Sequence, residues 1–188
     1  DPAWSEDVPL AEDHGFYGIK IHPVLDHYAV SRPALDDVFS CAQAHGWPIL
    51  THTDADGSPM DAASYEPLIK AFPDVALILA HLRWGAIPLA KRYNNVYLDT
   101  TYIDALTVEI GVDALGPDKI LFGSDAAEGF DVGREPARPR PRRSYASLVA
   151  GLQARGIPDA ALEKMLYENA RTLFGINPQT SATITYGG

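Results

Sequence analysis

Five apolar, β-branched segments of this sequence each end in a histidine or an aspartate. The five terminal residues are His22, His52, His81, Asp99 and Asp125. Imidazole and carboxylate groups hold Zn²⁺, Fe²⁺ or Mn²⁺ while leaving a coordination position open for water. A metal held in this way lowers the pKa of its water toward about 7, and neighbouring histidine or aspartate side chains can accept a proton or polarise a carbonyl. The pattern therefore indicates metal-assisted chemistry.

The segments that carry these residues resemble buried parallel strands, because they are almost continuously apolar. They cover residues 18–23, 48–52, 75–81, 95–100 and 119–125. Capping and breaking residues predict helices over 31–46, 59–72, 86–93, 103–115, 144–156 and 158–174. Strict alternation predicts an α/β fold with a parallel sheet, either closed into a barrel or open and doubly wound. In both architectures the active site lies at the carboxyl ends of the strands.

The bulk composition limits the class of protein. The chain has 188 residues, of which 46% are hydrophobic, enough for one sizeable core. A net charge of −10 argues against nucleic acid as a partner. No apolar run approaches the roughly 18 residues of a membrane span, and no signal peptide opens the chain. With Cys41 as the only cysteine, we expect a cytoplasmic protein that acts on a small molecule, without a membrane partner.

Six motifs, taken in order, resemble one enzyme family. They are GIKIHP (18–23), PILTHT (48–53), LAH (79–81), NVYLDT (95–100), ILFGSD (120–125) and ENARTLF (168–174). Together they are similar to the metal-dependent amidohydrolases, in the branch that includes enzymes like aminocarboxymuconate semialdehyde decarboxylase. The resemblance implies a partial TIM (β/α)₈ barrel with strands four to eight. Residues 1–176 would then form one incomplete barrel domain, and residues 177–188 a loose tail.

The same resemblance implies roles for three of the strand-end residues. His52 matches a metal-ligand histidine, and His81 matches a second histidine that either binds metal or acts on the substrate. Asp125 matches the aspartate that binds metal and handles the proton of the attacking water; the alternative is a helix N-cap. The implied cofactor is a divalent metal, zinc first, with iron or manganese as alternatives.

One part of the family pattern is missing. The family's first strand carries His-x-His, whereas no two histidines here are separated by one residue. We therefore expect the first three strand–helix units to be absent, and the start at Asp1 instead of Met agrees. The chain alone is then expected to bind metal weakly and to be inactive, although the full-length parent is an enzyme. Exposed edges and apolar surface of an open arc of strands also predict oligomerisation, as a homo-oligomer, or aggregation.

Four further residues are predicted to bind substrate. Lys20 shares a strand face with His22; it would contact substrate, bridge two metals if carboxylated, or be ion-paired in the barrel mouth. His22 is expected to line the pocket without binding metal. Arg83 could clamp a substrate carboxylate beside Trp84, and the alternative is a surface loop with a packed indole. We expect Asp99 to be structural and hydrogen-bonded to neighbouring backbone.

Three functions remain open at this point. The first is a metal-dependent hydrolase of a C–N or C–O bond in a small organic substrate, acting through metal-activated water. The second is a lyase on the same scaffold, a non-oxidative decarboxylase of an aromatic or enol acid. The third is a non-catalytic fragment or binding module that lacks a complete metal site.

Overall fold

Five short parallel strands form the centre of the computed structural model, which describes residues 7–124 and 145–176. The strands are β1 (Ile19–Ile21), β2 (Ile49–Thr51), β3 (Leu77–Leu79), β4 (Val96–Asp99) and β5 (Ile120–Leu121). Each pairs in parallel with the next, in the order β1-β2-β3-β4-β5. The predicted α/β class with a parallel sheet is confirmed. This order contains no reversal, which a doubly wound sheet would require.

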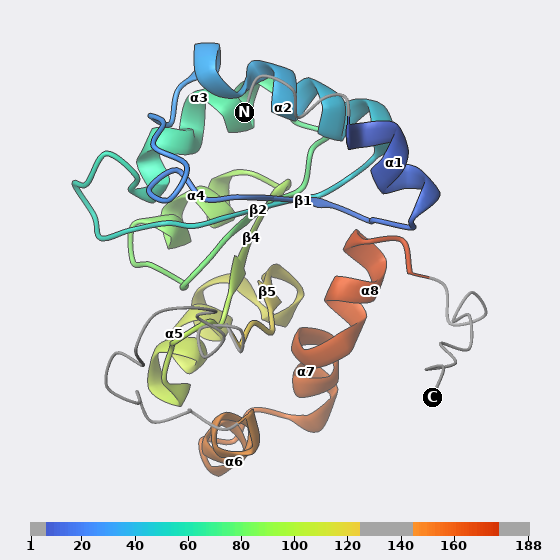
Figure 1. The fold of residues 1–188 in the computed structure, drawn as a ribbon. Coiled ribbons are helices and arrows are strands. Elements are labelled where there is room, and N and C mark those ends of the chain that lie inside the picture. The colour runs from blue at the N-terminus through green and yellow to red at the C-terminus, as the bar shows by residue number, and fades with distance from the viewer. Residues whose placement is uncertain (1–6, 125–144, 177–188) are drawn as a thin grey trace, which may run out of the picture.

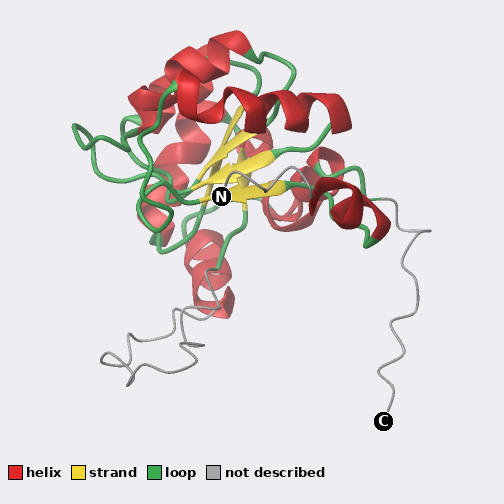
Figure 2. Cartoon of the chain, turned by 45° about the horizontal axis from the view of Figure 1, so that its top comes forward, coloured by secondary structure: helices red, strands yellow, loops and turns green. Residues whose placement is uncertain are grey.

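The helices surround these strands (Figures 1 and 2). They are α1 (Val8–Asp13), α2 (Arg32–His45), η2 (Ala62–Tyr65), α3 (Glu66–Ala71), α4 (Ala86–Arg92), α5 (Ala105–Leu115), η3 (Pro117–Lys119), α6 (Tyr145–Ala154), α7 (Asp159–Glu163), η5 (Lys164–Glu168) and α8 (Asn169–Leu173). The sequence did not predict α1, which has no buried residue. Within the described residues, no helix is long and apolar enough to cross a lipid bilayer.

The two faces of the sheet carry different side chains, because successive residues of a strand point to opposite sides. One face forms the core with the helices. Its strand residues include Ile21, Ile49, Leu77, Leu79, Val96, Leu98 and Ile120. The other face carries Lys20, Leu50, Ile78 and Tyr97 in one continuous register. By the same alternation, His22 and His52 continue this second face at the carboxyl ends of β1 and β2.

The helix predicted over 59–72 begins later than expected. The Asp61 carboxylate accepts hydrogen bonds from the N–H of Gly57 at 3.0 Å and from the N–H of Ser64 at 2.9 Å. It therefore caps η2 and at the same time closes the loop before it. Residues 52–61 form a loop at the carboxyl end of β2 instead of a first helical turn, so the prediction of a helix from Pro59 is wrong.

The last predicted helix is interrupted by a wider turn. The π-helical turn η5 separates α7 from α8, and its Met165 carbonyl accepts the N–H of Phe122 at 2.8 Å. The Asn169 amide, one residue after this turn, donates to the carbonyls of Pro117 and Ile120, both at 2.8 Å. The turn and the residue after it thus connect the last helices to the residues before, within and after β5.

Candidate functional site

The buried polar side chains of the described residues gather at one place, the carboxyl ends of β2, β3 and β4. They are Thr51, Thr53, His81, Asp99, Thr100 and Thr101. Burying a polar group costs free energy unless the group is hydrogen-bonded. A concentration of such groups at the edge where parallel strands end, away from the apolar core, marks the candidate site.

The imidazoles of His52 and His81 meet at this edge. Nδ1 of His52 lies 3.0 Å from Nε2 of His81, and the two rings are nearly perpendicular, at 75°. Nδ1 of His81 lies 3.2 Å from the Thr101 carbonyl oxygen. Because a carbonyl only accepts, this nitrogen carries the hydrogen. Nε2 of neutral His81 therefore offers its lone pair toward His52.

His22 completes a group of three imidazoles. Its ring stacks on that of His52 with centroids 4.2 Å apart and an angle of 11° between the rings. Burial, followed by the charges of His22, His81 and Lys20, lowers the pKa of His52 to about 4. His52 is therefore neutral near pH 7, the form in which an imidazole binds a metal.

The predicted substrate-binding residues lie around this group at different depths. Lys20 is exposed on the same sheet face, close enough for its charge to act on His52. Arg83 is half-buried, and its Nε has no hydrogen-bond partner among the described residues. Trp84 is 56% exposed. In the described part of the chain, no hydrogen bond or stacked ring joins the side chain of Arg83 or of Trp84 to an imidazole.

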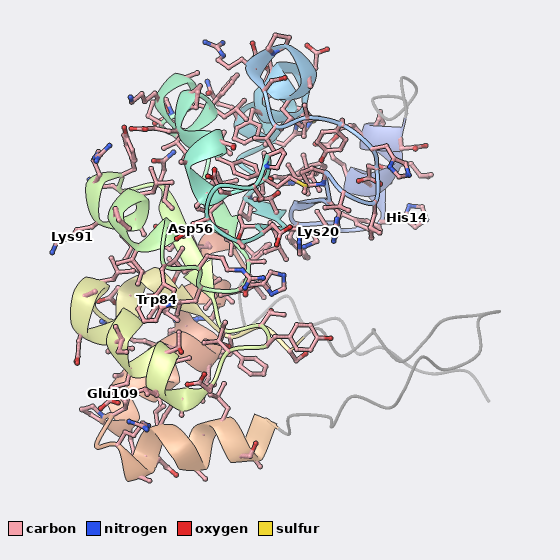
Figure 3. All side chains as sticks on the ribbon, turned by 90° about the vertical axis from the view of Figure 1, so that its left-hand side faces the viewer. His14, Lys20, Asp56, Trp84, Lys91 and Glu109 are labelled. Atoms are coloured by element: carbon pink, nitrogen blue, oxygen red, sulfur yellow. The ribbon has the colours of Figure 1, made fainter. Side chains whose placement is uncertain are left out.

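The loops after β2 and β3 are held to each other. The Asp56 carboxylate accepts the N–H of Gly85 at 3.1 Å, and Asp56 and Trp84 accordingly lie near one another in Figure 3. A Cβ on Gly85 would lie 2.5 Å from an Asp56 carboxylate oxygen, so the close approach needs glycine. This contact fixes the position of the loop that carries Trp84.

The backbone is bent sharply where β3 and β4 end. His81, Leu82 and Tyr102 have positive φ angles of 76°, 39° and 60°. Side chains other than glycine adopt this left-handed region at a cost, and such residues concentrate at functional sites. The Asp99 carboxylate compensates by accepting the N–H groups of His81 and Thr101. The predicted hydrogen bonding of Asp99 to neighbouring backbone is confirmed.

The donor set at this edge fits part of a metal centre. Two nitrogens that bind one tetrahedral Zn²⁺ at about 2.0 Å are about 3.3 Å apart, close to the 3.0 Å between His52 and His81. Within residues 7–124 and 145–176, no three histidine, cysteine, aspartate or glutamate side chains are grouped to hold a metal ion. Asp125, the predicted third ligand, lies outside the described residues.

The family model for amidohydrolases matches residues 3–176. The chain belongs to the amidohydrolase family. Proteins of this family are enzymes, hydrolases and decarboxylases among them, and they generally use divalent metal ions. The resemblance to the amidohydrolase family that was read from the sequence motifs is confirmed. No curated protein sequence matches this amidohydrolase significantly.

Solved structures show the same fold at low sequence identity. Dihydroorotase from Campylobacter jejuni has a TM-score of 0.67 and 21% identity, over 92% of this chain and 62% of its own. The 2,6-dihydroxybenzoate decarboxylase from Rhizobium has a TM-score of 0.65 and 16% identity, over 91% and 66%. A dihydroxybenzoic acid decarboxylase from Polaromonas, with bound manganese, has a TM-score of 0.50 and 18% identity, over 75% and 53%. This amidohydrolase thus spans less than two thirds of these relatives, which are TIM barrels.

Several residues that shape the site of this amidohydrolase were not predicted. Thr51 and Thr53 flank His52, and Thr53 donates to the carbonyl of Ala80, next to His81. The sequence did offer a signal for these two threonines, because they place hydroxyl groups on both sides of a histidine at the end of an otherwise apolar segment. Tyr65 contacts the His52 carbonyl from thirteen residues away, and nothing in the sequence points to that contact.

Proposed function

We propose that this amidohydrolase hydrolyses a C–N or C–O bond of a small organic substrate with the help of a divalent metal. The observation that carries the proposal is the 3.0 Å approach of His52 Nδ1 and His81 Nε2 at the carboxyl edge of the sheet. We assign the strands to positions four to eight of the barrel. This assignment would make His52 and His81 adjacent contributors to one central site.

Each residue has a part in the proposed reaction. His52 and Asp125 would hold the metal, with His81 either ligating it or polarising the substrate carbonyl. When bound, the ion would supply Lewis-acid chemistry, with zinc as the first candidate and iron or manganese as alternatives. Asp125 would take the proton of the attacking water, whose oxygen bonds to the acyl carbon. The C–N or C–O bond then breaks, and the proton passes to the leaving group.

A second candidate, non-oxidative decarboxylation of an aromatic or enol acid, is supported by aromatic groups at the mouth of the site. Tyr102 stacks on His81 with ring centroids 6.2 Å apart, and the indole of Trp84 is exposed on the neighbouring loop. Flat side chains of this kind suit an aromatic substrate. Lys20 and Arg83 would bind its carboxylate.

The decisive experiment compares the two reactions in the complete gene product. The protein is stripped with a chelator, reloaded with zinc or manganese, and offered ester, amide and lactone substrates in parallel with hydroxylated aromatic acids. Metal-dependent hydrolysis supports the first candidate, and CO₂ release supports the second. Turnover of neither class by the metal-loaded protein would contradict both and favour the non-catalytic alternative.

Asp125→Asn tests the assigned proton acceptor. We expect the rate to fall by a factor of about 10²–10⁴, as is usual for the loss of a general base. Asp113→Asn is the matched control, because Asp113 is exposed on α5 and removing its charge should leave the rate unchanged. Full activity of Asp125→Asn would exclude the assigned role.

A further inference from the structure

Tyr65 is a fully buried tyrosine on the helix side of the sheet, behind the imidazole group. Its hydroxyl lies 3.1 Å from the carbonyl oxygen of His52 and 2.7 Å from Oγ1 of Thr51. Burial raises the pKa of Tyr65 to about 12. The hydroxyl therefore stays protonated in the physiological range and remains a hydrogen-bond donor.

The two hydroxyls form a short chain that ends on His52. Each holds one hydrogen. If Thr51 donates to Tyr65, then Tyr65 donates to the His52 carbonyl. If Tyr65 donates to Thr51, then Oγ1 of Thr51 donates to the same carbonyl, at 3.3 Å. In both directions the His52 carbonyl is the final acceptor.

The other side of the His52 backbone is also held. Its N–H donates to the carbonyl of Ile21 on β1 at 3.3 Å. With the N–H bonded to β1 and the carbonyl bonded to one of the two hydroxyls, the His52 backbone cannot rotate without breaking a hydrogen bond. The direction in which the imidazole leaves the strand, toward Nε2 of His81, is therefore set from behind the sheet.

We propose that Tyr65 is a positioning residue, whose hydroxyl fixes the His52 imidazole against His81 so that the pair can bind one metal ion. This inference rests on the proposed metal-dependent function. A packing role needs only the aromatic ring, which phenylalanine would supply equally well. The hydroxyl is thus the part of the side chain that the positioning role requires.

The test compares Tyr65→Phe with a matched control, Tyr93→Phe. Tyr93 is half-buried and its hydroxyl donates to Glu66 at 2.6 Å, in a contact between α3 and the end of α4. Two quantities are measured: the ¹⁵N imidazole resonances of His52 and His81 in the metal-free protein, and the zinc affinity by competition with a chelator. Tyr65→Phe should shift the His52 resonances and weaken zinc binding about tenfold or more, as for loss of an outer hydrogen-bond partner of a ligand. Tyr93→Phe should change neither.

The outcomes separate positioning from simple stability. A Tyr65→Phe protein that melts at a lower temperature but keeps the parental His52 resonances and zinc affinity overturns the inference. If Tyr65→Phe does not fold, Thr51→Val leaves Tyr65 as the remaining hydroxyl donor to the His52 carbonyl and should keep the parental His52 resonances and zinc affinity; shifted resonances in Thr51→Val would assign the carbonyl to Thr51 and overturn the inference. If the parent itself binds no zinc, the proposed function fails, and the resonances of the metal-free variants still decide the role of Tyr65.

Discussion

The carboxylate of Asp99, at the end of β4, accepts a hydrogen bond from the backbone N–H of His81, which lies after β3. Oδ1 of Asp99 is 2.9 Å from the backbone nitrogen of His81. The same oxygen accepts a hydrogen bond from the backbone N–H of Thr101 at 3.0 Å. The Thr101 carbonyl in turn accepts a hydrogen bond from Nδ1 of His81. The end of β4 and the two residues after it thus hold both the backbone and the ring of His81. This explains how a histidine is kept at a φ of 76°.

Removing this acceptor should destabilise the protein. Asp99→Ala leaves two buried N–H groups without partners, at about 1–3 kcal/mol each, so we expect the free energy of unfolding to fall by at least about 2 kcal/mol. Asp99→Asn keeps an acceptor oxygen and should lose less. Urea denaturation of the three proteins measures the difference. Equal losses for alanine and asparagine would show that the acceptor is not what matters.

Metal binding should depend on His52. His52→Ala is expected to lower zinc affinity at least about 100-fold, because it removes one of the proposed ligands. Calorimetric titration of chelator-treated protein gives the affinity. The matched control is His14→Ala, since His14 is exposed before β1 and is bonded to the Leu10 carbonyl at 2.8 Å. A similar loss of affinity in both variants would point to nonspecific binding.

Gly123 should not tolerate a side chain. A Cβ at this position would lie 3.1 Å from the carboxylate carbon of Asp99 and still closer to the hydroxyl of Thr101. Because Asp99 and Thr101 are buried and the Asp99 carboxylate is hydrogen-bonded, Gly123→Ala should cost about 1–3 kcal/mol through overpacking. The expected result is a lower urea midpoint together with weaker zinc binding. An unchanged midpoint would mean that the end of β5 moves freely.

Asp104 gives a pH-dependent contribution to stability. As N-cap of α5 it accepts the N–H of Thr107 at 3.0 Å, and this hydrogen bond lowers the pKa of Asp104 below its ordinary 3.8. The stabilisation is thus complete above about pH 4 and is lost as the pH falls through the lower folded pKa. Asp104→Ala should cost about 0.5–1 kcal/mol at pH 7.

The pH series uses thermal unfolding between pH 7 and pH 3. The difference between Asp104→Ala and the parent should shrink as the pH falls below about 4. Asp104→Asn keeps a capping oxygen that does not titrate, so its stability relative to Asp104→Ala should stay constant across the series. A constant gap between the parent and Asp104→Ala would show that the carboxylate does not act as the cap.

The sequence was sufficient to predict that His22, His52 and His81 lie close together, because each of them ends an apolar segment. Parallel strands end at one edge, so polar residues that close successive apolar runs must come near each other. The stacking of His22 on His52 did not follow, because it depends on ring rotamers that spacing does not specify. The left-handed backbone of His81 was equally hidden, since it is imposed by Asp99, eighteen residues further along the chain.

Two local structures escaped prediction for similar reasons. Helix α1 buries no residue, so it leaves no apolar stripe to recognise. The loop at residues 52–61 replaces a predicted first helical turn because the Asp61 carboxylate competes for the backbone N–H of Gly57 and Ser64. Hydrogen bonds of this kind form between a side chain and the backbone. The periodicity of apolar residues indicates only apolar contacts and therefore does not predict them.

The π-helical turn η5 makes the number of residues in segment 164–168 important for the structure. It accommodates one residue more than a regular turn of α-helix. The Met165 carbonyl in this turn accepts the N–H of Phe122, and Met165 itself is buried in the core. Deleting one residue of 164–168 should restore a regular turn and withdraw this carbonyl from the end of β5. The attachment of β5 to the last helices therefore depends on the number of residues in this stretch as well as on their types.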